Sequence, residues 1–200
     1  MRAALAYTAR MHPADLAHLP DEELMLLVAN GFVEQPATEL FTRHNRALFN
    51  FLAWLCEGNL SEAEDLAQKT WVKLMTRCSD YRPGASAFTS FLFQIARNAW
   101  IDTRRRADTT TSVPLEDSHL QLPDEDLSTE QMAMLGQQQQ RVRTAVMALP
   151  DAQREVIVLR FFAGLSVEDI AQVVDEGFET VKSRLRYAFA KLRLSLDAAQ

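Results

Sequence analysis

Hydrophobic residues recur at intervals of three and four along most of this chain, which is the spacing of an amphipathic helix. Two of these stripes predict long helices, one over residues 40–55 and one that begins at Phe88. The apolar positions are Leu40, Phe41, Leu48, Phe51, Leu52 and Leu55 in the first stripe, and Phe88, Phe91, Leu92, Ile95 and Ala99 in the second. No segment alternates convincingly with period two, so the predicted fold is all-α.

Local signals set the expected limits of several helices. Asp21 is expected to cap a first helix, and Pro36 to mark a break before the second. Ser61 and Glu64 have the capping-box spacing and are expected to open a third helix. A further helix is expected over residues 152–162, directly after a proline.

The stretch over residues 165–193 predicts two helices joined by a tight turn. Ser166 and Asp169 have the capping-box spacing at the start of the first helix, and residues 175–177 (Asp-Glu-Gly) favour a turn. The second helix begins at Phe178, and its buried stripe is Val181, Leu185, Ala188 and Leu192. This layout is typical of a helix-turn-helix.

The second of these helices carries a polar stripe beside its apolar one. Glu179, Lys182, Ser183 and Arg186 are spaced three and four apart and point away from the buried face. Such side chains can reach base edges and phosphates in a major groove. Amphipathic basic helices also occur as plain solvated faces, but the preceding capped helix and turn favour DNA reading.

Charge is segregated along the chain, although the total is only −6. Residues 77–106 have a balance of +4 and residues 178–193 another +4, whereas residues 108–130 hold seven acids and no base. Two basic surfaces separated by an acidic connector suit two separate contacts with phosphates. With its threonines and prolines, the connector predicts a flexible linker.

The helical periodicity and the linker together predict two small helical bundles. The expected division is an N-terminal tail (1–19), a first domain (20–107), the linker (108–129) and a second domain (130–200). No apolar run approaches the roughly 20 residues of a membrane helix, and the N-terminus lacks the apolar core of a secretory signal. A cytoplasmic protein without membrane insertion is therefore expected.

Nothing in the sequence indicates a metal or cofactor site. Cys56 and Cys78 do not form a C-x-x-C motif, and the four histidines are scattered without zinc-ligand spacing. We expect both thiols to be buried or without a chemical role.

The loop over residues 80–86 and the helix after it favour a second kind of nucleic-acid contact. The loop begins with Asp80 and Tyr81, and the helix ends in three arginines at 104–106. Rings that stack on bases beside arginines that hold phosphates are typical of proteins that bind single-stranded or melted DNA. Taken alone, Tyr81, Phe93 and Trp100 are more simply explained as packing residues.

Several segments resemble, in order and spacing, the bacterial RNA polymerase sigma factors. The match is to the small extracytoplasmic-function type of the sigma-70 family, which has only the second and fourth sigma domains. It covers roughly residues 20–107 and 130–196, and it rests on AEDLAQ (63–68), Tyr81-Arg82, FTSFLFQIARN (88–98), Asp102 with Arg104-Arg105, Leu149-Pro150 and TVKSRL (180–185).

The resemblance implies a protein that is not an enzyme and needs no cofactor. It implies binding to core RNA polymerase through the clamp helices and the flap, recognition of the −10 and −35 promoter elements, and control by an anti-sigma factor. By position, Asp65, Gln68, Lys69 and Trp71 would contact the clamp helices. Contacts to the −10 element would come from Tyr81, Arg82, Arg97, Asn98, Arg104 and Arg105. Contacts to the −35 element would come from Glu179, Thr180, Lys182, Ser183, Arg184, Arg186 and Tyr187.

The sequence also departs from the family pattern at several positions. The family usually has Glu where Lys69 stands, Gly where Asp175 stands, a small residue where Glu179 stands, and often Trp where Phe91 stands. Glu179 at the groove end of a reading helix would repel phosphate, but it could accept a hydrogen bond from a cytosine amine. The promoter sequence therefore cannot be copied from relatives.

Two other kinds of function compete with this interpretation. A helix-turn-helix regulator with an N-terminal effector domain would not need the arginine-tipped helix. A recombinase or nuclease would need a nucleophilic serine or a carboxylate cluster on a scaffold. The only dense acids, residues 124–126, lie in the predicted linker.

Overall fold

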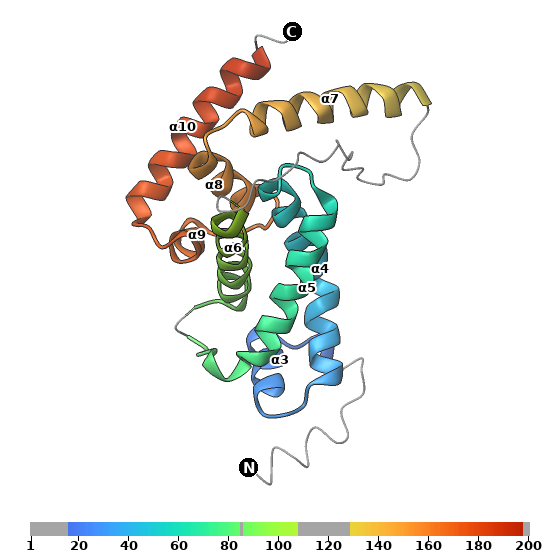
Figure 1. Ribbon diagram of the computed structural model, residues 1–200, viewed down its shortest axis with the longest axis vertical. Helices are drawn as coiled ribbons and strands as arrows, with labels where there is room; N and C mark the ends of the chain where they lie inside the picture. Colours follow the sequence, from blue (N-terminus) through green and yellow to red (C-terminus); the bar gives the residue numbers. More distant parts are fainter. Residues whose placement is uncertain (1–15, 85, 108–128, 198–200) are drawn as a thin grey trace.

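The computed structural model describes residues 16–84, 86–107 and 129–197, and the regular structure in these ranges is helical (Figure 1). None of the described residues forms a strand. The elements are α3 (Asp21–Ala29), α4 (Glu34–Leu55), α5 (Leu60–Thr76), the 3-10 turn η1 (Cys78–Asp80), α6 (Phe88–Ala107), α7 (Thr129–Met147), α8 (Asp151–Phe161), α9 (Val167–Val174) and α10 (Phe178–Asp197). The all-α prediction is confirmed. The predicted tail lies mostly, and the predicted linker almost wholly, outside the described residues.

Helices α3 to α6 form the first domain, with α4 packed between α3 and α5, and α6 packed on α5. Its core is the pair of apolar stripes seen in the sequence. Leu48, Phe51, Phe88 and Leu92 are fully buried, and the ring of Phe93 meets that of Phe51 edge-on at 5.3 Å. The stripes around residues 40–55 and 88–99 therefore face each other.

Three of the expected helix starts are wrong. α4 begins at Glu34, six residues early, because Pro36 lies in its first turn, where no backbone donor is lost. α5 is capped by Asn59, whose side chain accepts a hydrogen bond from the Glu62 amide at 3.2 Å, and not by Ser61. Asp21 is the first helical residue of α3 rather than its cap.

The carboxylate of Asp21 instead fixes the start of the first domain to α4. It accepts hydrogen bonds from Arg43 at 2.8 Å and His44 at 2.7 Å. Arg43 also donates to the carbonyl oxygens of Leu16, Ala17 and Leu19, so one guanidinium holds the turn before α3. This network spans more than 20 residues of sequence and leaves no local pattern.

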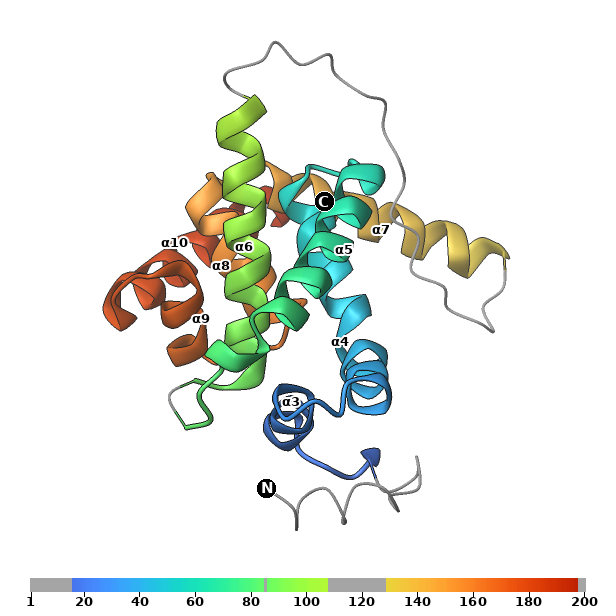
Figure 2. The ribbon, with the colours of Figure 1, turned by 60° about the horizontal axis from the view of Figure 1, so that its bottom comes forward.

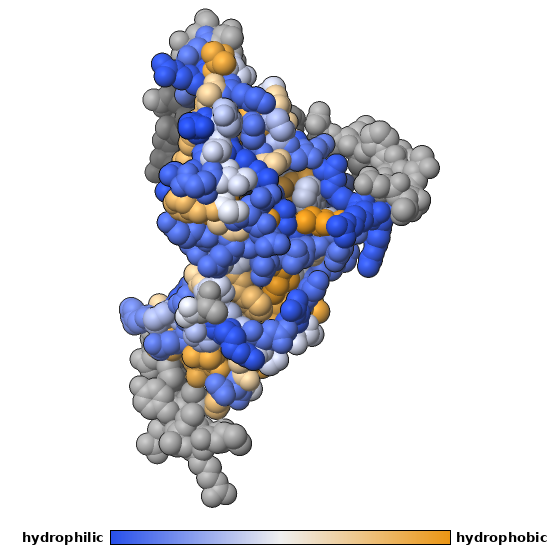
Figure 3. Space-filling view, turned by 90° about the vertical axis from the view of Figure 1, so that its left-hand side faces the viewer, coloured by the Kyte–Doolittle hydropathy of each residue, from blue (hydrophilic) through white to orange (hydrophobic). Residues whose placement is uncertain are grey.

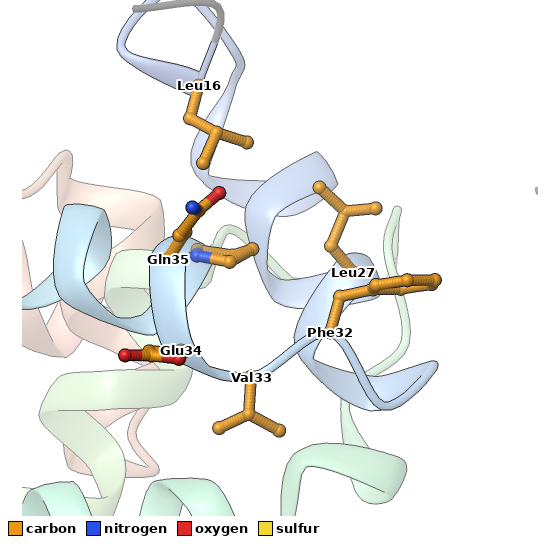
Figure 4. Close-up of a pocket in the computed structure, with 7 residues that line it drawn as sticks. Leu16, Leu27, Phe32, Val33, Glu34 and Gln35 are labelled. Atoms are coloured by element: carbon orange, nitrogen blue, oxygen red, sulfur yellow. The ribbon is translucent and has the colours of Figure 1, made fainter. Parts of the chain in front are cut away.

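The same corner encloses a pocket of about 210 Å³, drawn in Figure 4. Leu16 comes from the turn before α3, Leu27 from α3, and Phe32 and Val33 from the loop to α4. Glu34, Gln35 and Pro36 of α4 complete the lining, so the pocket depends on the early start of that helix.

Helices α7 to α10 form the second domain. The core of α8 to α10 includes Val156, Leu159, Ile170, Val173 and Val181, each at most 1% exposed. α10 packs on α8 and α9, and α7 contacts α10. The second domain is therefore built around the predicted helix-turn-helix.

The two domains pack against each other. The sequence predicts two bundles joined by a flexible linker and does not indicate contact between them. α9 lies against α6 and α8 contacts α4, so α6 has the first domain on one side and the second domain on the other (Figure 2). The rings of Trp54 and Phe162 meet across this interface at 5.1 Å, and the buried residues of both domains form one continuous cluster. The described residues thus adopt a closed arrangement.

Candidate nucleic-acid and partner interfaces

The side chain of Ser166 caps the start of α9, the first helix of the helix-turn-helix. The Ser166 hydroxyl accepts a hydrogen bond from the Asp169 amide at 3.0 Å and donates to the Asp169 carboxylate at 2.6 Å. A cap of this kind satisfies an amide that would otherwise lack a partner at the helix start. The predicted cap is confirmed.

The turn after α9 forms although glycine is absent from its critical position. Asp175 lies in the left-handed region with φ 56° and ψ 51°. Aspartate tolerates this region better than most residues, so the substitution costs little. The Glu176 amide donates to the carbonyl oxygen of Ala171 at 3.0 Å, which closes the end of α9.

α10 buries one stripe and exposes another, as predicted. Val181, Leu185 and Ala188 are buried and Leu192 is partly buried. Among the predicted −35 contacts, Ser183 and Arg184 are partly exposed, and the exposed ones are Glu179, Thr180, Lys182, Arg186 and Tyr187. The side of the molecule with α9 and α10 is largely hydrophilic in Figure 3. These positions therefore form one accessible polar face.

Two ion pairs along this face moderate its charge. Lys182 lies 3.2 Å from the Glu179 carboxylate, and Arg184 lies 2.5 Å from that of Glu176. Exposed pairs of this kind contribute little free energy, so phosphates can replace the acids. Lys182 and Arg186 also lie over the rings of neighbouring aromatic residues, at 5.2 Å in each case. The cations are thus partly ordered by contacts with neighbouring side chains.

The predicted −10 residues on α6 differ in accessibility. Asn98, Arg104 and Arg105 are exposed, and the Arg104 guanidinium lies 5.3 Å from the centre of the Trp100 ring. Arg97 is only 20% exposed, and its Nε donates to the carboxylate of Glu155 on α8 at 2.6 Å. Arg104 also lies 3.9 Å from the carboxylate of Asp151 on α8, so the second domain contacts two of the four α6 residues, and only Arg97 is largely covered.

The loop before α6 places Tyr81 in the core rather than in solvent. Tyr81 is 4% exposed, its ring packs on those of Phe88 and Phe91, and its hydroxyl donates to the Ser86 carbonyl oxygen at 3.3 Å. Burial, with a smaller contribution from Glu22, raises its pKa to about 12. Tyr81 and Phe93 act here as packing residues, and Tyr81 would have to leave its site to stack on a base. Its neighbour Arg82 is exposed.

α5 presents an open groove of about 520 Å³ to solvent. Three of the predicted clamp contacts line it, together with the exposed apolar side chain of Val72: Asp65, Gln68 and Lys69. Trp71 lies on the opposite face, 9% exposed, where its indole donates to Asn45 at 3.0 Å. Trp71 therefore positions α5 on α4 and does not line the groove.

The sequence interpretation missed two sets of residues. Lys73 and Thr76 also line the α5 groove and were not among the predicted clamp contacts. The contacts of Glu155 and Asp169 with α6 join residues 58 and 79 positions apart, for which the sequence contains no local signal.

No group of residues in the described ranges could hold a metal ion, and no helix there is long and apolar enough to span a membrane. Cys56 is buried and Cys78 partly buried, and both thiols are free. Burial raises the pKa of Cys56 to about 12, and the nearby carboxylate of Glu62 adds to this shift. Cys56 is therefore a packing thiol, as expected.

These observations define a two-domain helical DNA-binding protein, with a helix-turn-helix in one domain and an arginine-tipped helix in the other. Comparison with known families gives the same order of parts: residues 40–110 match Sigma-70 region 2, and residues 145–194 match Sigma-70, region 4. The chain belongs to the sigma-70 family, and its relatives place it among the extracytoplasmic-function (ECF) sigma factors.

Two of those relatives are mycobacterial. The chain is 27% identical to the ECF RNA polymerase sigma factor SigE of Mycolicibacterium smegmatis over 95% of its own length and 74% of that protein. It is 32% identical to SigM of Mycobacterium tuberculosis over 77% of its length and 74% of that protein. Among solved structures, CnrH in complex with the cytosolic domain of CnrY matches with a TM-score of 0.67 and 26% identity, over 90% of this chain and 99% of CnrH.

Proposed function

We propose that this chain is an alternative sigma factor that binds core RNA polymerase and directs it to promoters by reading their −10 and −35 elements. The observation that carries the proposal is the order of the two sigma-70 regions along one chain, each with an accessible polar face. Its role is to bind and position other molecules rather than to catalyse a reaction.

The proposed domain division follows the sequence prediction. Residues 20–107 form sigma domain 2, residues 130–200 form sigma domain 4, residues 108–129 link them, and residues 1–19 form a tail. Two moderate contacts on one chain raise each other's effective concentration, so neither needs to be tight.

The α5 groove is the proposed site for the clamp helices of the polymerase. Asp65, Gln68 and Lys69 would make direct contacts, and Trp71 would support them by fixing α5 on α4. Because Lys69 replaces the usual acid, we expect the groove to favour a partner surface with a matching acid.

The −10 element is the proposed ligand of α6 and the loop before it. Asn98 would bind the edge of an unpaired base, while Arg97, Arg104 and Arg105 would hold the backbone. Arg82 and Tyr81 complete the proposed site, with Tyr81 acting only after its ring has left the core. Unpairing a base costs a few kcal/mol, which these contacts must offset.

The exposed face of α10 is the proposed reader of the −35 element. Lys182, Arg184 and Arg186 supply phosphate contacts, and Thr180, Ser183 and Tyr187 lie on the same helix to contact the groove. Glu179 leads this face and can accept a hydrogen bond from a cytosine amine.

An anti-sigma factor and the polymerase flap are further proposed partners, and the cytoplasm is the proposed location. The related CnrH was solved with the cytosolic domain of CnrY. In this chain the rings of Phe161 and Phe189 are 57% and 48% exposed and meet edge-on at 5.4 Å on the second domain. Paired exposed aromatic rings suit a protein partner better than solvent.

Co-elution with purified core RNA polymerase tests the proposal. We expect the chain to form a stable complex with core enzyme in gel filtration. A regulator with an effector domain would bind DNA by itself and would elute apart from the polymerase. The regulator is the weaker candidate, because it would have an effector domain where this chain matches Sigma-70 region 2.

A further inference from the structure

The first amide of α6 is capped by a side chain from another helix. α6 begins at Phe88, and Ala87, which occupies the capping position, has no side-chain acceptor. The Phe88 amide instead donates to Glu22 Oε1 of α3 at 3.2 Å. A carboxylate at this place satisfies an otherwise unpaired donor and interacts favourably with the positive end of the helix dipole. The start of α6 is therefore held by a residue 66 positions away in the sequence.

The residue next to Glu22 ties α3 to α4. Asp21 accepts hydrogen bonds from Arg43 at 2.8 Å and from His44 at 2.7 Å. The ring of His44 also lies 5.3 Å from that of Phe88, measured between the ring centres. The carboxylates of two successive residues thus connect α3 to both α4 and α6, so the fold of the first domain fixes the position of the cap.

The loop before α6 is attached to the first domain at two places. At one end the ring of Tyr81 packs on Phe88 and Phe91. Its hydroxyl donates to the Ser86 carbonyl oxygen at 3.3 Å. At the other end the Glu22 carboxylate holds the Phe88 amide. When Tyr81 leaves its site to meet a base, the first attachment is lost, whereas the bond from Phe88 to Glu22 can remain.

We infer that Glu22 is a positioning residue for reading the −10 element: it fixes the start of α6 while Tyr81 leaves the core to stack on an unpaired base. Without this cap the first turn of α6 would fray, and the end of the loop would lose its fixed position. Ordering the loop would then cost free energy, and capture of the base would offset less of the cost of unpairing. α3 lies outside the residues that match Sigma-70 region 2, so the match assigns it no role. The inference rests on the proposed function of α6.

Four substitutions separate the cap from general effects. Glu22→Ala removes the acceptor, whereas Glu22→Gln loses the charge but keeps an oxygen that can accept from the Phe88 amide. Glu23→Ala is the matched control for charge, because Glu23 is exposed on the same helix. Asn59→Ala is the matched control for stability. It removes the side-chain cap of α5, in the same domain but at the end of α5 that is remote from η1.

Amide exchange, measured by NMR on the free full-length chain, tests the cap itself. Glu22→Ala should speed the exchange of the Phe88 amide by about tenfold or more, because this amide loses its partner. Glu22→Gln and Glu23→Ala should leave the rate close to that of the wild-type chain. Asn59→Ala should instead speed the exchange of the Glu62 amide, which Asn59 caps. An unchanged Phe88 rate in Glu22→Ala would overturn the inference.

Transcription with core polymerase tests the effect on the −10 element. Each variant is compared on a duplex promoter that the wild-type chain uses and on the same promoter with mismatched −10 strands. Glu22→Ala should reduce the transcript yield from the duplex about fivefold, as expected for a lost cap. The reduction should be less than about twofold on the mismatched template, where no base pairs have to be opened. Glu22→Gln and Glu23→Ala should act like the wild-type chain on both templates.

A merely structural role of Glu22 would give a different result. Loss of folded protein lowers the yield equally on both templates, and Asn59→Ala would share that loss. Equal losses on the two templates in Glu22→Ala would therefore overturn the inference, as would a duplex defect of the same size in Glu22→Gln or Asn59→Ala. Absence of any transcript with the wild-type chain would contradict the proposed function itself, which the exchange rates do not test.

Discussion

The hydroxyl of Ser166 accepts a hydrogen bond from the Asp169 amide at the start of α9 and donates one to the Asp169 carboxylate, whose other oxygen accepts a hydrogen bond from Ser90 of the first domain. The carboxylate of Asp169 thus supports the Ser166 cap and contacts α6. The cap lies at the start of α9, on which α10 packs.

Removing the cap with Ser166→Ala should destabilise the chain by about 1 kcal/mol, since an amide at the helix start loses its partner. Urea unfolding followed by circular dichroism measures this change. Ser195→Ala, an exposed serine on α10, is the control and should change the free energy of unfolding by less than about 0.5 kcal/mol. Equal values for the two variants would show that the cap does not stabilise the second domain.

Lys182→Ala and Arg186→Ala should each weaken transcription from promoters that depend on a −35 element, while core binding survives. Both cations lie on the exposed face of α10. Each phosphate contact that is lost should reduce the slope of log binding constant against log salt concentration by about one. Transcription at several salt concentrations and co-elution with core enzyme are the measurements. Loss of core binding in either variant would contradict the assignment of α10.

Asp65→Ala should weaken association with core polymerase by about tenfold, because interface contacts that matter typically contribute more than 1 kcal/mol. Asp65 lines the α5 groove, whereas the neighbouring Glu64 is exposed on the same helix and does not. Glu64→Ala is therefore the matched control. Titration of core enzyme against labelled chain gives the two dissociation constants, and similar values would remove the groove from the proposed interface.

The stability of the chain should fall at alkaline pH. Burial raises the pKa of Cys56 from 9.0 to about 12, with a smaller contribution from the nearby carboxylate of Glu62. Below pH 9 the thiol is protonated in both states, so its contribution to stability is fully present. Between pH 9 and 12 the unfolded chain loses this proton while the folded chain keeps it, so the free energy of unfolding decreases.

Urea unfolding at several pH values above 9 tests this linkage. Cys56→Ala should make the decline shallower, and Tyr81, whose pKa burial raises from 10.0 to about 12, should account for part of the remainder. Cys78→Ser serves as the control, because Cys78 is only partly buried. An unchanged slope in Cys56→Ala would show that this thiol does not govern the decline.

The helix-turn-helix could be predicted because its signals are local. The Ser166 cap, the Asp175 turn and the buried stripe from Val181 to Ala188 each involve residues within a few positions of one another. The start of α5 was misplaced because Asn59 and Ser61 are both good capping residues two positions apart. Pro36 was read as a break because a proline in the first turn of a helix resembles one between helices.

The docking of the domains could not be predicted from the sequence. The hydrogen bonds from Arg97 to Glu155 and from Ser90 to Asp169 join residues far apart in the chain. In the sequence, each of these residues resembles an ordinary exposed polar position on its own helix. The burial of Tyr81, in contrast, agrees with its simpler explanation as a packing residue. Its assignment to the −10 contacts and that of Trp71 to the clamp contacts were taken from the resemblance, which does not show which face of the fold a residue occupies.

Mapping of transcript 5′ ends from a promoter library tests the central claim most directly. Core RNA polymerase is assayed with and without the full-length chain. We predict that a new set of start sites appears only when the chain is present, and that shared −10 and −35 sequences precede these sites. The substitution Arg186→Ala should reduce the number of transcripts from them. Start sites that do not change when the chain is added would contradict the account.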